Sequence, residues 1–370
     1  MNSTFWKGRK VFLTGHTGFK GAWLSLWLSE IGANVCGYAL EPATTPSLFE
    51  LAHVRQRLNH KIGNILDLDT LRYALRHSGA EIVIHMAAQA LVRESYVDPV
   101  GTYATNVMGT VNLLETVRGT DSVRVVLVVT SDKCYENREW KWGYREIDRL
   151  GGYDAYSNSK ACSEMVVSSY RNAFFPPTSH AVHGVVIASA RAGNVIGGGD
   201  WAKDRLIPDM MRAFVAGKVP VIRFPNADRP WQHVLEPLAG YLLLCEQCWQ
   251  FGTSFGQAWN FGPDHRDAKP VKWVADRLTQ LWGENVRWQL DDDHHPHEAT
   301  YLSLDTTNAR TRLGYRPRWG LEDALGKVVE WYKALHDGKP MEKITLDQIV
   351  SFMLAQPMTK DVDKTMEHSR

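Results

Sequence analysis

The chain has 370 residues, of which 44% are hydrophobic and 22% are charged, so enough apolar side chains are present for a sizeable core. Its 42 lysines and arginines almost balance its 41 acidic residues, and the formal net charge is +1. This balance excludes a global basic field for nucleic acid and a polybasic membrane surface.

The N-terminal segment and the cysteines predict a cytoplasmic protein. The first residues contain no apolar segment with a cleavage site, and no apolar stretch approaches the roughly 20 residues that cross a membrane. The five cysteines are an odd and sparse set in a chain of this length, unlike a disulfide framework. We therefore expect a reduced protein of the cytoplasm that binds no membrane.

The first half of the chain alternates strand-like runs with helical stretches. The expected strands are residues 11–15, 34–40, 61–66, 81–88, 123–130 and 183–192. The expected helices are residues 18–32, 69–76, 99–117 and 156–174. This alternation is typical of an α/β fold with a doubly wound parallel sheet of the Rossmann type.

The amino-acid composition changes after about residue 193, where glycine, proline and tryptophan become frequent. Helices are still expected, at residues 206–216, 235–248, 271–282 and 321–336. We predict a dinucleotide-binding domain over residues 1–192, to which residues 231–258 return. We predict a smaller α+β substrate-binding lobe over most of residues 193–350, and a tail over residues 351–370, where no clear pattern remains.

Three glycines follow the first expected strand in the stretch TGHTGFKG, residues 14–21. Gly15 permits a tight turn, Gly18 lets the backbone approach a pyrophosphate, and Gly21 lets the next helix pack close to the sheet. The free N–H groups at the start of that helix attract phosphate. The stretch predicts a dinucleotide site, and a glycine loop without a ligand is the alternative.

The ribose of NAD usually binds an acidic residue about 20 residues after the glycines. No aspartate stands at the tip of the second expected strand, Glu41 lies slightly beyond it, and no arginine replaces it. Glu41 is either a ribose ligand or a solvated loop residue. At this point the choice between NAD and NADP stays open.

Tyr156 and Lys160 lie four residues apart in an expected helix and therefore share one face. A nearby ammonium favours the phenolate and lowers the pKa of the tyrosine. A phenolate can take a hydroxyl proton while hydride leaves the same carbon. Ser131, just after the strand at 123–130, would donate a hydrogen bond to the substrate oxygen, or it only caps the strand end.

Together these motifs resemble the extended short-chain dehydrogenases/reductases over most of the chain. The similar stretches are residues 14–21, HMAAQ at 85–89, TNVMGT at 105–110, the Tyr156/Lys160 pair, RAGNVIGGGDW at 191–201 and RPWQHV at 229–234. Within this family the chain resembles the nucleotide-sugar 4,6-dehydratases. It has Asp132-Lys133 like their CDP-glucose branch, where the dTDP-glucose branch has Asp-Glu.

The resemblance implies NAD as the cofactor, CDP-glucose as the substrate, and a product used for dideoxyhexose synthesis. It implies that Tyr156 takes the proton of the sugar 4-hydroxyl and that Asp132 protonates the departing 6-hydroxyl. Lys133 is the candidate base at carbon 5, and a surface lysine is the alternative. In this family the helices that match residues 99–117 and 156–174 commonly form a dimer interface, so a homodimer or homotetramer is expected.

The resemblance also implies the binding residues. The cofactor contacts would be Gly15, His16, Thr17, Gly18, Phe19, Gly21, Asn64, Ile65, Ala87, Ala88, Gln89, Asn106, Tyr156 and Lys160. The family commonly has aspartate at the position of Asn64, and Asn106 either braces the active-site backbone or is an ordinary helix residue. The sugar-nucleotide contacts would be Asn194, Arg229 and Arg205, for which a solvated first-turn residue is the alternative.

Two other motifs suggest metal sites but are predicted not to bind metal. Cys245 and Cys248 lie in an apolar helical run without a second cysteine pair, so buried structural thiols are expected. The stretch DDDHHPH at 291–297 is expected to be an exposed loop, since Pro296 interrupts helical spacing.

Three alternative functions stay open from the sequence. A nucleotide-sugar 4-epimerase would use Tyr156 but would not need Asp132 and Lys133. A 4,6-dehydratase for another nucleotide sugar would keep all of them, because the cytidine preference rests on the resemblance. A catalytically idle dinucleotide sensor typically loses the tyrosine or the lysine, and both are present here.

Overall fold

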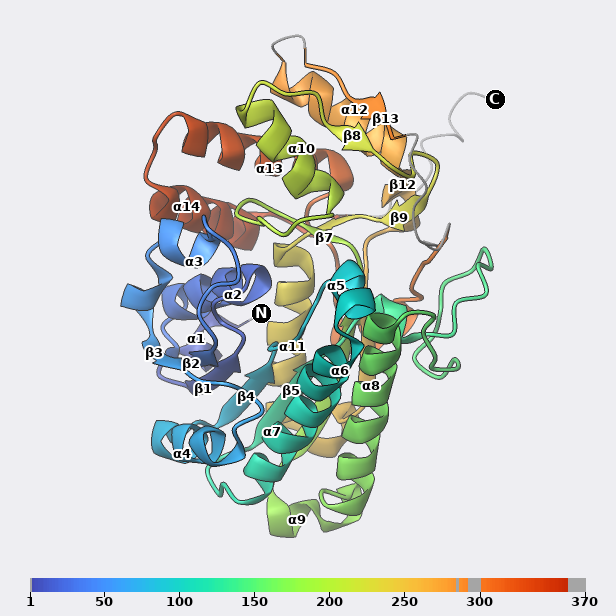
Figure 1. The fold of residues 1–370 in the computed structure, drawn as a ribbon. Helices are drawn as coiled ribbons and strands as arrows, with labels where there is room; N and C mark the ends of the chain where they lie inside the picture. The colour runs from blue at the N-terminus through green and yellow to red at the C-terminus, as the bar shows by residue number, and fades with distance from the viewer. Residues whose placement is uncertain (1, 284–285, 292–300, 359–370) are drawn as a thin grey trace, which may run out of the picture.

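A seven-stranded parallel sheet forms the centre of the computed structural model, which describes residues 2–283, 286–291 and 301–358 (Figure 1). Its strand order is β11-β6-β5-β4-β1-β2-β3. The strands are β1 (Lys10–Thr14), β2 (Asn34–Ala39), β3 (Asn59–Ile62), β4 (Ile82–His85), β5 (Val125–Val129), β6 (Val186–Ala192) and β11 (Ala258–Phe261). The order reverses between β1 and β4, the switch point at which such sheets bind dinucleotides. The predicted doubly wound Rossmann sheet is confirmed.

Helices cover both faces of this sheet (Figure 1). α2 (Phe19–Glu30) and α11 (Leu235–Phe251) share a hydrophobic core with one face of the strands. α4 (Leu68–Ser78), α7 (Gly109–Arg118) and α8 (Ala155–Ala173) share a second core with the other face. Side chains alternate between the two faces of a strand, so strands that are apolar throughout need a helical layer on each side.

The expected helix over residues 99–117 has a π-helical turn in its middle. α6 (Pro99–Tyr103) leads into this turn (Ala104–Met108), which continues directly into α7. Short helices complete this half of the chain: α1 (Ser3–Trp6), α3 (Leu48–Leu51), α5 (Val92–Val97) and α9 (His180–His183). π-helical turns within longer helices often occur at functional sites, and this one carries Asn106.

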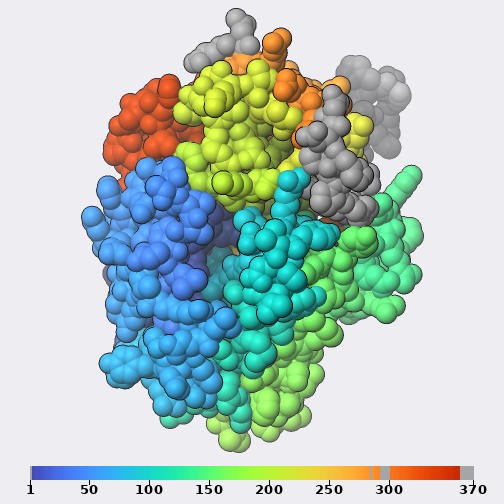
Figure 2. Space-filling model, in the orientation of Figure 1, coloured from blue at the N-terminus to red at the C-terminus, as the bar shows by residue number. Residues whose placement is uncertain are grey.

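In the described part of the chain, the residues predicted for the second lobe form short strand pairs and helices, and Figure 1 shows α10, α12 and α13 together at the top of the molecule. Its elements are β7 (Val195–Ile196), α10 (Leu206–Val215), β8 (Val221–Ile222), β9 (Asp228–Pro230), β10 (Gln232–His233), β12 (Ala268–Pro270), α12 (Val271–Trp282), β13 (Gln289–Leu290) and α13 (Leu321–His336). Figure 2 shows the surface hollowed where the blue N-terminal segment, the cyan segment of α5 and α6 and the yellow-green segment of α10 meet.

The structure corrects three details of the sequence analysis. β3 occupies residues 59–62 instead of 61–66, because this edge strand is polar and lacks the apolar pattern of the inner strands. The returning segment continues beyond residue 258, since β11 extends to Phe261. The tail begins later than residue 351, because α14 (Met341–Leu354) buries Phe352. The division into two domains stays a prediction.

No helix in the described part of the chain is both long enough and apolar enough to span a membrane.

Phe352 should be essential for stability, because its ring packs edge-on against Trp27 and Trp319 with centroids 5.5 and 5.0 Å away. We expect Phe352→Ala to lower the free energy of unfolding by about 3–5 kcal/mol. Leu354→Ala, two residues further on and 76% exposed, should change it by less than about 0.5 kcal/mol. Denaturant unfolding followed by circular dichroism measures both. Equal effects would show that α14 does not belong to the core.

Candidate active site

The glycine loop between β1 and α2 has the geometry of a phosphate-binding turn. Gly15 has φ of +76°, and a Cβ there would lie 2.7 Å from the backbone nitrogen of Ala87. A Cβ on Gly21 would lie 2.1 Å from the carbonyl oxygen of Gly15. Gly18 caps α2 without a side-chain acceptor, and the nearest atom to its added Cβ lies 3.4 Å away. The loop therefore fits a pyrophosphate, and that contact stays a prediction.

The other side chains of the loop point into the protein. The His16 ring shares a hydrogen bond of 2.7 Å with His60, and burial together with His60 lowers the pKa of His16 to about 3. Thr17 Oγ1 donates to the carbonyl of Leu40 at 2.9 Å. The ring of Phe19 packs near Gly197. These three residues would thus meet a cofactor mainly through their backbone.

Hydrogen bonds connect the expected cofactor contacts that follow β4 with residues of the neighbouring helices. The Asn106 amide accepts from the Gln89 N–H at 2.9 Å and donates to the Gln89 carbonyl and to Ser159 Oγ. The Gln89 side chain donates to Thr102. Ala87 and Ala88 are half-buried. Bracing is the role that the structure supports for Asn106.

The two residues expected at the adenine have their side chains engaged elsewhere. Asn64 Oδ1 accepts from the Leu66 N–H at 3.0 Å, within its own turn. Ile65 is 5% exposed and packs against Gly109 of α7. Glu41 is exposed, 4.0 Å from Arg55. The contacts of this end of the cofactor stay predictions.

Ser131, Asp132 and Lys133 lie at the carboxyl end of β5. Ser131 caps a single 3-10 turn (Asp132–Cys134), and its hydroxyl donates to Asp132 Oδ1 at 3.0 Å. Asp132 Oδ2 is buried and has no hydrogen-bond partner among the described residues. Burial raises the pKa of Asp132, against the opposing effects of Lys133, the Ser131 hydrogen bond and Arg229. A carboxyl with a raised pKa holds its proton to higher pH than an exposed one, which favours a role as an acid.

Tyr156 and Lys160 reach the same place from α8. Burial raises the pKa of Tyr156 to about 12, while a hydrogen bond with Ser131 and the nearby Arg205 lower it. Burial lowers the pKa of Lys160 to about 8, and Glu164 opposes this shift. The expectation that Lys160 brings the pKa of Tyr156 toward neutrality is wrong for the protein alone, because desolvation of the phenolate is the larger effect.

A buried ion pair positions α8 against the sheet. Arg191 of β6 binds Glu164 of α8 at 2.8 Å, with 4% and 2% of the two side chains exposed. Thr130 and Ser189 donate to the same carboxylate. Burial opposes ionisation, but Arg191 and these hydrogen bonds hold the pKa of Glu164 below its usual value. One turn of α8 separates this pair from Lys160, so it determines where Lys160 and Tyr156 lie.

The expected sugar-nucleotide residues lie around this centre. Arg229 of β9 is half-buried and close enough to Asp132 to lower its pKa. Arg205 forms an ion pair with Asp200 at 3.0 Å and faces Tyr156. Asn194 lies between β6 and β7, and its carbonyl accepts from Gln232 N–H at 3.1 Å. The structure thus brings Arg205 and Arg229 to the reaction centre, and their binding roles stay predictions.

Lys20 is a residue of this centre that the sequence analysis did not single out. Its ammonium donates to Tyr241 OH at 3.3 Å, and the charges of Lys160, Arg205 and Asp132 all act on it. The only signal in the sequence was a lysine inside the glycine motif, which has no meaning until the fold shows where its side chain points.

The two suspected metal motifs have different outcomes. Cys245 and Cys248 are free, buried thiols on α11, and burial raises the pKa of both. The acidic and histidine-rich stretch lies outside the described residues except for Asp291. Within residues 2–283, 286–291 and 301–358, no group of three or more His, Cys, Asp or Glu side chains could hold a metal ion.

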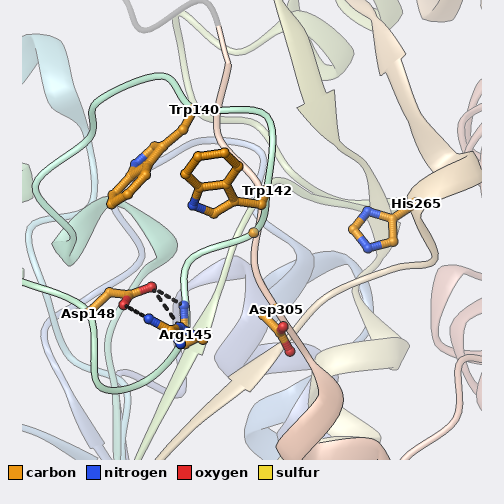
Figure 3. A pocket seen from close by; sticks show the side chains of 7 residues that line it. Trp140, Trp142, Arg145, Asp148, His265 and Asp305 are labelled. Carbon is orange, nitrogen blue, oxygen red and sulfur yellow. Dashed lines mark hydrogen bonds and ion pairs between the residues drawn. The ribbon is translucent and has the colours of Figure 1, made fainter.

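A cavity of about 580 Å³ lies away from these residues, beside the loop that follows the 3-10 turn (Figure 3). Its lining residues are Trp140, Trp142, Gly143, Arg145, Asp148, His265 and Asp305. None of the predicted site residues is among them, so the cavity is no part of the predicted active site.

The chain is similar to nucleotide-sugar enzymes of known sequence and structure. Residues 12–328 match a family model described as GDP-mannose 4,6 dehydratase. The chain is 53% identical over 355 residues to the CDP-glucose 4,6-dehydratase of Salmonella typhimurium strain LT2, covering 96% of this chain and 99% of that protein. It is 25% identical over 293 residues to the dTDP-glucose 4,6-dehydratase of Streptomyces niveus, covering 78% and 80%.

Solved structures share the fold. The dTDP-glucose 4,6-dehydratase of Bacillus anthracis in complex with NAD has a TM-score of 0.73 at 19% identity, covering 90% of this chain and 99% of that one. The UDP-glucose 4-epimerase of Thermotoga maritima with UDP-glucose has a TM-score of 0.75 at 19% identity, covering 88% and 99%. The fold is thus common to dehydratases and epimerases, and only the site can separate them.

Removing the buried ion pair between Arg191 and Glu164 should lower the free energy of unfolding. Arg191→Met leaves the Glu164 carboxylate buried without its partner, and we expect the free energy of unfolding to fall by about 3–5 kcal/mol. The matched control is Arg118→Met, which breaks an exposed pair with Glu115 and should cost less than about 1 kcal/mol. Urea unfolding measures both. Similar losses would refute the special role of the buried pair.

Proposed function

The chain belongs to the GDP-mannose 4,6-dehydratase family, and we propose that it catalyses the 4,6-dehydration of CDP-glucose as a hydro-lyase. The product would be CDP-4-keto-6-deoxyglucose, released together with one water. The 53% identity to a CDP-glucose 4,6-dehydratase over nearly the full length of both chains supports the substrate. Asp132-Lys133 at the end of β5 agrees with this branch of the family.

The buried carboxyl of Asp132 is the structural observation that carries the proposal. A 4-epimerase needs a group that removes and returns a hydroxyl proton, and Tyr156 is such a group. A dehydratase also needs an acid that protonates a poor leaving group. Asp132 has this character, because burial raises its pKa and its Oδ2 has no partner among the described residues.

The reaction begins at carbon 4 of the sugar. Tyr156 removes the proton from the 4-hydroxyl as the hydride leaves carbon 4, and Ser131 donates a hydrogen bond to the oxygen that becomes the ketone. The Ser131 hydroxyl is close enough to Tyr156 to lower its pKa. Arg205, whose charge lowers the pKa of Tyr156, places positive charge near the phenolate that forms.

Elimination of water follows. The ketone at carbon 4 acidifies the proton at carbon 5, which Lys133 removes. Asp132 gives its proton to the 6-oxygen, which leaves as water, and a double bond forms between carbons 5 and 6. Hydride adds at carbon 6 and a proton returns to carbon 5. The overall reaction involves no net oxidation or reduction.

NAD is the proposed cofactor, and when it is bound it takes up the hydride from carbon 4 and returns it to carbon 6. The uncapped start of α2 and the close turn at Gly15 fit its pyrophosphate. Ala87 and Ala88, which follow β4, are the proposed contacts on the ribose and nicotinamide side. Glu41 is the candidate for its ribose, since it is exposed just beyond β2.

Arg229 and Arg205 are the proposed partners of the substrate diphosphate, with Asn194 beside them. A guanidinium offers two parallel donors to phosphate oxygens. Arg229 lies near Asp132, and Arg205 lies near Tyr156, so both approach the sugar end of the substrate. The near-zero net charge of the chain means that such placed arginines, instead of an overall field, would hold the anionic ligand.

A homodimer is the proposed unit of assembly, with a tetramer as a further step. Val100 and Tyr103 of α6 and Met165 of α8 are exposed apolar side chains. A hydrogen bond of 2.9 Å between Tyr103 and Asn158 shows that these two helices lie together. A second copy would cover this face. The five free cysteines are consistent with the proposed cytoplasmic location.

Purified protein supplied with NAD and CDP-glucose should form a 4-keto-6-deoxy product, recognised by its absorbance in alkali. In D₂O, deuterium should enter carbon 5, since the proton there exchanges with solvent during elimination. Turnover of dTDP- or GDP-glucose but not of CDP-glucose would contradict the substrate. Conversion of CDP-glucose to its 4-epimer without deuterium at carbon 5 would identify an epimerase.

Asp132→Asn should separate the two halves of the reaction. The amide cannot supply the proton, so we expect product formation to fall by about 10²–10⁴-fold. Oxidation at carbon 4 should persist, and addition of substrate should raise the absorbance of reduced nicotinamide. Asp121→Asn, at an exposed turn before β5, serves as the control and should match the wild type. A fully active Asp132→Asn enzyme would remove this carboxyl from the mechanism.

A further inference from the structure

Tyr135 is a buried tyrosine two residues after Lys133, and the proposed mechanism leaves it without a role. Its side chain belongs to the 1% exposed residue at the end of the 3-10 turn. Its hydroxyl accepts a hydrogen bond from Arg191 Nη1 at 2.7 Å and donates to Asn260 Oδ1 at 2.8 Å. Arg191 and Asn260 are paired residues of the neighbouring strands β6 and β11. Two side chains of the central sheet therefore hold this hydroxyl.

The Arg191 guanidinium binds two separate elements at once. Its Nη2 binds Glu164 of α8 at 2.8 Å, and its Nη1 binds the Tyr135 hydroxyl. The central carbon of the guanidinium lies 5.0 Å from the centroid of the Tyr135 ring. A guanidinium is planar, and its donors point in fixed directions. Both bonds are therefore made only when α8 and the chain after β5 have one relative position.

Each of the two bonds lies close in the chain to one half of the proposed reaction. Glu164 is one helical turn from Lys160, which belongs to the oxidation at carbon 4. Tyr135 directly follows the turn that carries Asp132 and Lys133, which belong to the elimination of water. One guanidinium thus connects the helix of the oxidation step with the turn of the elimination step.

The turn is only three residues long, so its position depends on the residues at its two ends. Ser131 caps its start. At its other end the Cys134 carbonyl accepts a hydrogen bond from the Gly151 N–H at 2.9 Å. This bond attaches the turn to another loop, whereas the Tyr135 side chain attaches it to the central sheet. The hydroxyl of Tyr135 therefore helps to set where the acid and the base lie.

We propose that Tyr135 is a positioning residue for the elimination of water. Its hydrogen bond with Arg191 keeps Asp132 and Lys133 within reach of carbons 5 and 6 of the oxidised sugar. This proposal rests on the proposed dehydratase function. In the step, the carbon-5 proton goes to Lys133, the Asp132 proton goes to the 6-oxygen, which leaves as water, and a double bond forms between carbons 5 and 6. Tyr135 exchanges no proton and acts through position alone.

Tyr135→Phe tests the hydroxyl while keeping the ring, which stacks on Tyr144 with centroids 5.2 Å apart. Tyr144→Phe is the matched control. Tyr144 is the other ring of the same stack and is 2% exposed, and its hydroxyl donates to Asn137 at 3.0 Å. Thermal unfolding first establishes that both variants are folded. Product formation from CDP-glucose and the absorbance of reduced nicotinamide are then measured together.

In Tyr135→Phe we expect elimination to slow by about 10–100-fold, because a small displacement of catalytic groups from the reacting atoms is enough for such a loss. Oxidation at carbon 4 should keep its rate, so reduced nicotinamide should accumulate after CDP-glucose is added. The Kd for CDP should stay that of the wild type, since the variant leaves the proposed diphosphate ligands in place. Tyr144→Phe should match the wild type in all three measurements.

Arg191→Lys is a second, independent variant. An ammonium keeps the positive charge beside Glu164, but it lacks the planar fork that binds two partners in fixed directions. We expect reduced nicotinamide to accumulate in this variant as well. Adding Tyr135→Phe to it should slow elimination little further, because the two changes remove the same contact and their effects are not additive.

Two results would overturn the proposal. One is a folded Tyr135→Phe enzyme that forms product at the wild-type rate without accumulating reduced nicotinamide. The other is an equal slowing of oxidation and elimination, which would mean that the hydroxyl only stabilises the fold. If Tyr135→Phe does not fold, Arg191→Lys is judged by the same two results. A wild-type enzyme that leaves CDP-glucose unchanged would refute the proposed function instead, which separates the two failures.

Discussion

The buried pair between Glu164 and Arg191 is the interaction on which the site depends. It joins α8 to β6, and Thr130 ties the same carboxylate to the end of β5. The three elements that carry the proposed chemistry are therefore fixed by one charge network inside a low-dielectric interior. Such a pair adds little net stability over apolar packing, but it tolerates only one arrangement of its partners, because a displaced charge would be left unpaired. This charge network therefore helps to set the relative positions of Tyr156, Lys160 and Ser131.

Desolvation governs the protonation of the groups around that network. The same burial that raises the pKa of Asp132 and Tyr156 lowers the pKa of Lys160 and Lys20. Burial thereby shifts the pKa of the acids upward and the pKa of the amines downward, which brings both kinds of group closer to proton exchange at neutral pH. These groups lie close together because the parallel strands end at one edge of the sheet. The turns that follow the strands bring separate parts of the chain to that edge.

The main features of this arrangement could be predicted from local patterns. The glycine spacing, the Tyr156–Lys160 pair and the Ser131-Asp132-Lys133 run are each contained within a few residues, and the alternation of strands and helices orders them along one sheet edge. Lys20, in contrast, has no neighbour in the sequence that indicates where its side chain lies. Its partners Tyr241, Asp132 and Arg205 are more than 100 residues away, and only folding brings them together. The edge strand β3 was predicted with shifted bounds because it is polar, and helix α14 was not predicted because its pattern is weak.

The sequence by itself determined the fold class, the place of the dinucleotide loop and the residues proposed for catalysis, because hydrophobic periodicity and short motifs are local properties. The tertiary structure decided which charges meet. It showed that Lys160 does not by itself bring the pKa of Tyr156 toward neutrality, that Arg205 faces Tyr156 while paired with Asp200, and that Lys20 belongs to the centre. The physical reason is that a pKa depends on burial and on neighbours in space, and neither is written in the order of the residues.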